Sequence, residues 1–137
     1  MSVSYNAYMQ LTLVERKTEA PGVESFLFKA HEGITWKAGQ YLHYVLHHLP
    51  TDDRGSDRWF TISSAPYEGR PMITTRLSAE KPSTFKTMLS QMKVGDAIEA
   101  TDVDGNFTLD DMSGSYVLLA GGIGITPFHS MLKEMDH

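Results

Sequence analysis

The sequence predicts a mainly β protein: a six-stranded antiparallel barrel with one inserted helix, followed by a C-terminal strand and helix. Its first hundred residues contain short apolar runs separated by turn residues, with little helical periodicity, which is typical of an antiparallel barrel or sandwich. Two segments, one near residue 85 and one after residue 115, depart from this pattern. We favour the barrel because closing a sheet of short strands removes its exposed edges. The expected strands are Tyr8–Arg16, Val23–Lys29, Tyr41–Leu46, Arg58–Ile62, Met72–Leu77 and Ala97–Ala100.

The inserted helix is predicted from Ser83 to Met92. Apolar residues recur there at intervals of three and four, after Pro82 and a Ser-Thr pair suited to capping. The first turn of a helix presents free backbone N–H groups and the positive end of the helix dipole, which together can receive a phosphate. An ordinary cap on an amphipathic helix is the alternative.

The C-terminal stretch changes character. A continuous apolar run over Tyr116–Ala120 is followed by the glycine-rich turn Gly121–Pro127 and by helical spacing over Phe128–Met135. Unbroken hydrophobicity suits a parallel strand buried on both faces, and such a strand needs further strands beside it. We therefore expect residues 1–112 to form the barrel domain and residues 113–137 to be the first strand and helix of an incomplete second lobe.

Composition argues against several classes of function. Among the 137 residues, 12 Lys and Arg against 17 Asp and Glu give a net charge of −5, the wrong sign for holding nucleic acid by its phosphates. Because the chain has no cysteine, it cannot form disulfides or hold zinc–thiolate or iron–sulfur sites, and redox work would need a bound cofactor. No apolar run of roughly 18 residues and no leader peptide is recognisable, so we expect no membrane segment and a cytoplasmic or cytosol-facing location.

The segment Arg58–Ser64 carries the most informative chemistry. On a strand, Arg58 and Phe60 face one side while Trp59 and Thr61 face the other. Such a set suits a planar heterocycle that carries phosphate. Arginine offers a bidentate fork to phosphate oxygens, an aromatic ring offers a stacking face, and a hydroxyl can bond a ring nitrogen. A barrel strand with exposed polar residues is the alternative.

Over nearly its whole length the chain resembles the ferredoxin-NADP reductase-like flavoproteins. The stretch Arg58–Ser64 is similar to the flavin signature of that family, and other similar elements follow in the family's order. They are Ala38–Tyr41 before the signature, Ile73–Leu77 beside the flavin, Lys81–Lys86 at the pyrophosphate, Val94–Asp96 and Asp104–Phe107 near the end of the barrel, and Gly121–Pro127 at the opening of the nicotinamide-nucleotide lobe.

The resemblance implies a Greek-key barrel that binds FAD, with FMN as the less favoured cofactor. It implies that Arg58 pairs with the flavin diphosphate, that Phe60 stacks on or flanks the isoalloxazine, and that Thr61 is the catalytic residue, bonding near flavin N5. The other implied contacts are Trp59 in the flavin signature, Thr75 and Arg76 at the ribityl chain or ring edge, Ser83 and Thr84 at the pyrophosphate, and Gly121, Gly122, Gly124 and Thr126 at a nicotinamide dinucleotide.

The function implied by the resemblance is that of an oxidoreductase passing electrons from NADH or NADPH through FAD to an acceptor, which is a protein or a small molecule. The implied partners are the dinucleotide, the acceptor and the remainder of a C-terminal NAD(P) lobe. The alternative is a non-catalytic barrel that has lost flavin and serves in binding or regulation, with Trp59 and Phe60 as core or partner contacts. Lys81, where many family members have glycine, favours that alternative.

No metal site is expected. On a strand, His43 and His47 would lie about 13 Å apart, too far for one ion, so these are expected to be surface histidines. The acidic segment 102–106 lacks the glycine and glutamate positions of a calcium loop. The charged loop 51–57 is expected to be solvated, with a role near the adenine half of the cofactor as the alternative.

Overall fold

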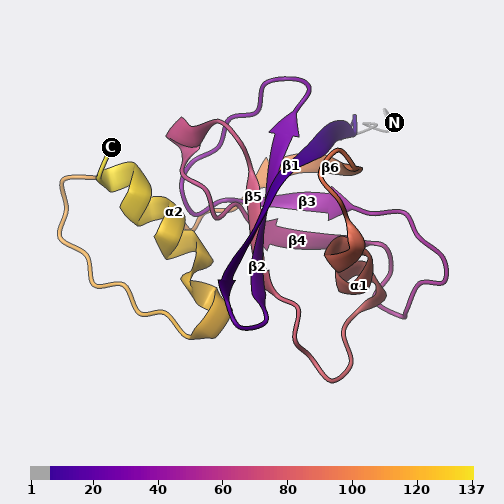
Figure 1. Ribbon diagram of the computed structural model, residues 1–137. Coiled ribbons are helices and arrows are strands. Elements are labelled where there is room, and N and C mark those ends of the chain that lie inside the picture. Colours follow the sequence, from indigo (N-terminus) through magenta and orange to yellow (C-terminus); the bar gives the residue numbers. More distant parts are fainter. Residues whose placement is uncertain (1–6) are drawn as a thin grey trace, which may run out of the picture.

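The computed structural model describes residues 7–137 (Figure 1). All six expected strands and the inserted helix are present, so the mainly β prediction is confirmed. β1 and β6 run four residues further than expected. The elements in chain order are β1 (Met9–Ala20), β2 (Val23–Ala30), β3 (Tyr41–Val45), β4 (Asp57–Thr61), the 3₁₀ turn η1 (Pro66–Glu68), β5 (Met72–Arg76), α1 (Thr84–Gln91), β6 (Ala97–Asp104), the 3₁₀ turn η2 (Gly122–Ile125) and α2 (Thr126–Met135).

The six strands form one antiparallel sheet in the order β4-β3-β6-β1-β2-β5. Strands distant in sequence pair at β3–β6 and β6–β1, as in a Greek key. The two edge strands approach where β4 ends, because the Ser63 N–H donates to the Met72 carbonyl at 2.9 Å. The sheet is therefore a nearly closed barrel, and its short edges are mostly covered.

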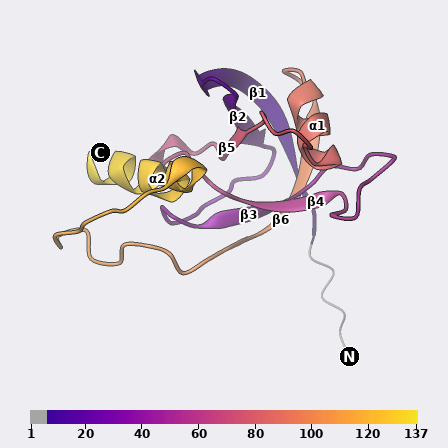
Figure 2. The same ribbon diagram turned by 90° about the horizontal axis from the view of Figure 1, so that it is seen from below.

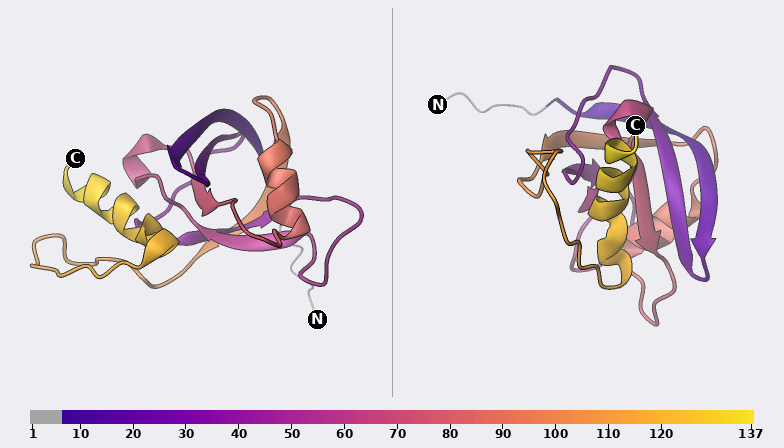
Figure 3. Two further views of the ribbon diagram at one scale, coloured as in Figure 1. Left: turned by 60° about the horizontal axis from the view of Figure 1, so that its bottom comes forward. Right: turned by 90° about the vertical axis from the view of Figure 1, so that its left-hand side faces the viewer.

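Alternate residues of the strands fill the barrel, and α1 packs against the same core. Phe85 and Leu89 of α1 are fully buried, and each such side chain stabilises the fold by about 1.5–3 kcal/mol. Figure 3 shows the strands curving around this core with α1 beside them. Further fully buried side chains from the barrel include Leu11, Leu13, Phe26, Phe28, Leu42, Tyr44, Ile62 and Ile73.

The two helices lie on opposite sides of the barrel (Figures 1 and 2). α1 begins where predicted, with the Ser83 hydroxyl accepting the Lys86 N–H at 3.2 Å as its N-cap. α2 is fastened to the segment that follows β4. Its Ser130 hydroxyl donates to the Ser64 carbonyl at 2.7 Å, and Lys133 pairs with Glu68 at 2.6 Å. Each helix therefore sits over a different end of β4.

The strand predicted at Tyr116–Ala120 is wrong. Residues 105–121 contain no helix or strand, and Val117 and Leu119 are 88% and 85% exposed. A parallel strand forms only against neighbouring strands, and every strand within residues 7–137 belongs to the barrel sheet. The helix predicted after the glycine turn is confirmed as α2, while the domain boundary at residue 112 stays a prediction.

Two of the motif segments meet at the side of the barrel that faces α2. The Gln40 side-chain amide donates to the Gly105 carbonyl at 3.1 Å. Gly39 has a φ of 99°, and a Cβ there would lie only 1.9 Å from the Phe107 carbonyl oxygen. This turn therefore requires glycine.

Among the described residues, no helix is long and apolar enough to cross a membrane.

Candidate functional site

β4 directs Arg58 and Phe60 toward α1. Phe60 is half-buried between two aromatic rings, with centroid distances of 6.0 Å to Tyr44 and 5.8 Å to Phe85. The Arg58 guanidinium carbon lies 5.7 Å from the centroid of the same Phe85 ring. The arginine and the aromatic residue of the signature thus share one face of the strand, as its alternation predicts.

Trp59 and Thr61 lie on the outer face of β4. The indole of Trp59 is 50% exposed and stacks on the His43 ring at 4.5 Å, while the Tyr41 ring meets it edge-on at 5.1 Å. Thr61 lines a shallow hollow together with Trp59 and Tyr41. Trp59 therefore presents a broad exposed aromatic surface beside the predicted catalytic hydroxyl.

A carboxylate of the chain itself occupies the start of α1. The Thr84 N–H donates to Asp52 Oδ2 at 2.9 Å, and the Asp52 N–H donates to Thr84 Oγ1 at 3.1 Å. The prediction of a merely solvated loop at 51–57 is therefore wrong for Asp52. We call the group Asp52, Arg58, Ser83 and Thr84 the anion site, because free backbone N–H groups at a helix start favour negative charge there.

Positive charge surrounds the anion site. Partial burial, and then the positive charges of three arginines, hold the pKa of Lys86 below its ordinary value. The hydrogen bond from the Thr84 N–H is the largest influence on Asp52; together with Arg54 it outweighs desolvation and lowers the pKa of that carboxyl. The three arginines that act on Lys86 are Arg54, Arg58 and Arg76.

Arg58 keeps unused hydrogen-bonding capacity in the anion site. Its Nη1 donates to the backbone carbonyls of Arg54 and Asp57. Its Nη2 is buried, has no hydrogen-bond partner, and lies 3.7 Å from Asp52 Oδ1. A buried donor that has an ion-pair contact but no hydrogen bond is unfavourable, so this atom is suited to a further acceptor.

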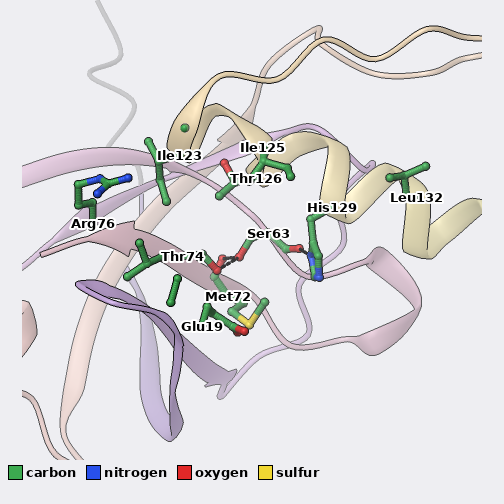
Figure 4. Close-up of a pocket in the computed structure, with 13 residues that line it drawn as sticks. Glu19, Ser63, Met72, Thr74, Arg76, Ile123, Ile125, Thr126, His129 and Leu132 are labelled. Atoms are coloured by element: carbon green, nitrogen blue, oxygen red, sulfur yellow. Dashed lines mark hydrogen bonds between the residues drawn. The ribbon is translucent and has the colours of Figure 1, made fainter.

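A cavity of about 410 Å³ separates the barrel from the start of α2 (Figure 4). We call it the α2 cavity. Three predicted residues, Arg76, Gly122 and Thr126, line it, and its size is within the roughly 300–1,000 Å³ of small-molecule sites. Arg76 also connects the two regions, because its backbone carbonyl accepts a hydrogen bond from Lys86 at 3.0 Å. The remaining lining residues are Glu19, Ala20, Val23, Ser63, Met72, Thr74, Ile123, Ile125, His129 and Leu132.

The α2 cavity contains polar residues that the motifs did not indicate. Thr74 lies there in place of Thr75, which is 3% exposed and faces the barrel interior. The Thr74 hydroxyl lies 2.7 Å from that of Ser63, and the His129 Nδ1–H donates to the Ser63 carbonyl at 2.6 Å. Strict alternation along β5 from the apolar Ile73 would have assigned Thr75 to the interior.

The glycine turn before α2 is open. Gly121, Gly122 and Gly124 are exposed, and a Cβ at any of them would meet no atom within 4 Å. Only Gly122, with a φ of 57°, needs glycine for its backbone. Packing within the chain therefore does not explain why Gly121 and Gly124 are glycines. The lack of a side chain at both positions suits close approach by a ligand.

The histidines contact protein groups. His43 Nε2 lies 2.6 Å from Asp57, and His47 pairs with Glu99 at 3.0 Å. The His48 Nδ1–H donates to the Leu46 carbonyl, so its Nε2 accepts the Thr84 hydroxyl at 2.8 Å. Residues 7–137 contain no group of three His, Asp or Glu side chains arranged to hold a metal ion.

No family model matches the chain, but known proteins are similar to it in sequence and in fold. Flavohemoprotein B of Dictyostelium discoideum is 32% identical over 131 residues, covering 85% of this chain and 31% of the relative. Phthalate dioxygenase reductase superimposes with a TM-score of 0.77 at 24% identity, over 94% of this chain and 40% of that structure. The chain has the ferredoxin-NADP reductase-like fold. The resemblance inferred from the motifs is thereby confirmed.

The similarity extends over almost all of this chain but over only part of each relative. A ferredoxin-NADP+ reductase from Neisseria gonorrhoeae, solved with bound FAD and NADP, superimposes with a TM-score of 0.70 at 20% identity, over 92% of this chain and 50% of that structure. The chain spans about a third of the length of the flavohemoproteins it matches. It therefore corresponds to one part of such proteins.

Proposed function

We propose that this chain is the flavin-binding part of an oxidoreductase that passes electrons from NADH or NADPH through FAD to an acceptor. The observation that carries the proposal is that Arg76 contacts both the anion site and the α2 cavity. Its backbone carbonyl accepts a hydrogen bond from Lys86 beside the anion site, and Arg76 also lines the α2 cavity. FAD carries phosphate and a planar ring system on one flexible chain, so it suits a site with these two parts. The relatives and the fold support the same conclusion.

The anion site fits the phosphate of the cofactor. The buried and unpartnered Nη2 of Arg58 offers a charged donor, and the Thr84 N–H offers a backbone donor at a helix start. Lys86 and Arg54 add positive charge around the same point. The helix dipole adds about 0.3–1 kcal/mol in favour of an anion where the site is exposed.

When bound, the flavin accepts a hydride equivalent and can release electrons one at a time. The residues of this chain bind and position it. Thr61, on the outer face of β4 beside the exposed Trp59, provides the hydroxyl proposed to donate a hydrogen bond to the ring. Phe60, held by Tyr44 and Phe85 on the same face of β4 as Arg58, is the ring proposed to stack on or flank the isoalloxazine.

The nicotinamide dinucleotide is proposed to approach the exposed turn at Gly121, Gly122 and Gly124, with Thr126 at the helix start. The open space above these glycines lets a ligand come close to the backbone. Three features remain part of the proposal: further lobe residues beside α2, an acceptor that is a protein or a small molecule, and a cytoplasmic or cytosol-facing location.

Purified protein provides the test. We expect it to copurify with, or to be reconstituted by, a yellow flavin that heat releases and that mass spectrometry identifies as FAD. Recovery of FMN alone would correct the cofactor. A colourless protein that neither FAD nor FMN reconstitutes would refute the proposal and favour a non-catalytic barrel module.

A further inference from the structure

The loop between β3 and β4 carries a carboxylate to the start of α1. Asp52 and Thr84 are 32 residues apart in sequence, yet each donates a backbone hydrogen bond to the side chain of the other, at 2.9 and 3.1 Å. His48, from the same loop, accepts the Thr84 hydroxyl at 2.8 Å. The chain thus holds a carboxylate of its own where the proposed function needs the flavin phosphate.

The carboxylate does not satisfy every donor around it. Its Oδ2 accepts from the Thr84 N–H and from Arg54 Nη2, at 2.9 and 3.1 Å. Its Oδ1 accepts from the Arg54 N–H at 3.0 Å and lies 3.7 Å from Nη2 of Arg58, an ion-pair distance at which that nitrogen makes no hydrogen bond. A tetrahedral phosphate has more acceptor oxygens than a carboxylate, so it can serve both Thr84 and Arg58.

We propose that Asp52 is an internal competitor for the cofactor phosphate and selects FAD over FMN; the proposal rests on the function proposed above. The flavin phosphate displaces the carboxylate from the Thr84 N–H but leaves its negative charge nearby, on the loop before β4. The repulsion that Asp52 exerts on a bound flavin therefore grows with the charge on the nearest phosphate, and it offsets part of the attraction from the surrounding cations.

The two flavin nucleotides differ in that charge. The phosphate monoester of FMN carries about 1.5 to 2 negative charges near neutral pH, while each phosphate in the diphosphate of FAD carries one. Riboflavin has no phosphate and therefore does not compete with Asp52. At the phosphate nearest to Asp52, the repulsion is largest for FMN and smaller for FAD, whose second charge lies one phosphate further away, and it is absent for riboflavin.

The test compares the wild-type chain with Asp52→Asn, and uses Asp53→Asn as a matched control. Asn keeps the shape of Asp52 and can still accept the Thr84 N–H, but it lacks the charge. Asp53 is exposed and makes no hydrogen bond or ion pair within residues 7–137, so its replacement causes the same change in net charge. The dissociation constants of FAD, FMN and riboflavin are measured by fluorescence titration, and thermal unfolding checks that each variant is folded.

We expect Asp52→Asn to tighten FMN binding about twentyfold and FAD binding about fivefold, and to change riboflavin binding less than about twofold. Asp53→Asn is expected to change all three by less than about twofold. Weaker binding of FAD and FMN to Asp52→Asn, or an equal gain for all three flavins, would overturn the inference. If Asp52→Asn does not fold, Asp52→Ser provides the same comparison.

Inorganic pyrophosphate separates the two proposals. If no flavin binds, the proposed function fails, but the competition at the anion site can still be measured from the stabilisation of each variant by pyrophosphate. A larger increase in melting temperature for Asp52→Asn than for the wild type and Asp53→Asn supports the inference. Equal increases, or none, overturn it.

Discussion

The anion site and the α2 cavity, which lie toward different ends of β4, differ in how much of their surface the chain itself already occupies. At the anion site the chain supplies its own counterion, Asp52, to a helix start surrounded by cations. Beside the α2 cavity the turn of three glycines is exposed, and a Cβ added at any of them would meet no atom of residues 7–137 within 4 Å. Under the proposed function, the first region exchanges one set of contacts for another on binding, whereas the second is only covered.

The largest effect on stability is expected from the buried ring that packs against the Arg58 side chain of the anion site. Phe85→Ala removes a fully buried ring that contacts Phe60 and Arg58, and should lower the free energy of unfolding by about 3–5 kcal/mol. Urea denaturation measures this loss. The matched change Phe107→Ala, at a 58% exposed ring packed on Phe128, should cost only about 1 kcal/mol. Equal losses would show that α1 does not support the barrel as described.

A second change tests the packing beside α2. Gly39→Ala should lower the free energy of unfolding by about 2–3 kcal/mol, because φ is positive there and the new Cβ would meet the Phe107 carbonyl and the Met131 side chain. Gly124→Ala should change it by less than about 0.5 kcal/mol, because its Cβ would enter open space. Chemical denaturation of both variants makes the comparison. A cost at Gly124 as large as that at Gly39 would contradict the open turn.

Arg58→Ala tests whether the anion site binds phosphate. Charge-assisted hydrogen bonds contribute about 1.5–3 kcal/mol, so the affinity for FAD should decrease by about 10- to 100-fold, while that for riboflavin changes little. Fluorescence titration gives both values. Arg70→Ala removes an exposed guanidinium whose residue bonds only through its carbonyl within the described chain, and should leave FAD binding unchanged. Equal losses for FAD and riboflavin would exclude a phosphate role for Arg58.

The smallest effect is expected where α2 joins the barrel. Burial alone would raise the pKa of Glu68, but Lys133 and the Ala65 N–H outweigh it and hold the pKa below its ordinary 4.5. The pairing therefore stabilises the fold fully above pH 4.5, and its contribution is lost as the pH falls through the lowered pKa. Lys133→Ala should cost about 0.2–1 kcal/mol at pH 7. Denaturation at several pH values should show the difference from wild type shrinking in acid, and a constant difference would rule out the ion pair as its source.

The sequence predicted those parts of the fold that depend on local patterns. Alternation identified the strands, and a three-and-four repeat identified α1, because burial on one face leaves a periodic trace in the sequence. The run Tyr116–Ala120 was wrongly predicted to be a strand. A buried strand needs apolar residues and also a neighbouring strand to pair with, and within residues 7–137 no strand pairs with this run.

The site was predictable where its residues belong to a motif and not where distant segments meet. Arg58, Thr84 and Arg76 lie around one region as the motifs suggested. Thr75, implied at the ribityl chain or ring edge, is 3% exposed and shares the side of β5 that the buried Ile73 occupies, so its contact with the flavin stays a prediction. Asp52 leaves no local signal, since its significance depends on a helix 32 residues away.

The exposed indole on β4 gives the molecule a built-in optical probe. Of its two tryptophans, Trp36 is 7% exposed and Trp59 is 50% exposed beside Thr61. Light emitted by Trp59 will therefore respond to whatever covers that hollow, while Trp36 reports on the integrity of the barrel. Entry of a ligand and loss of the fold can be followed separately without attaching a dye.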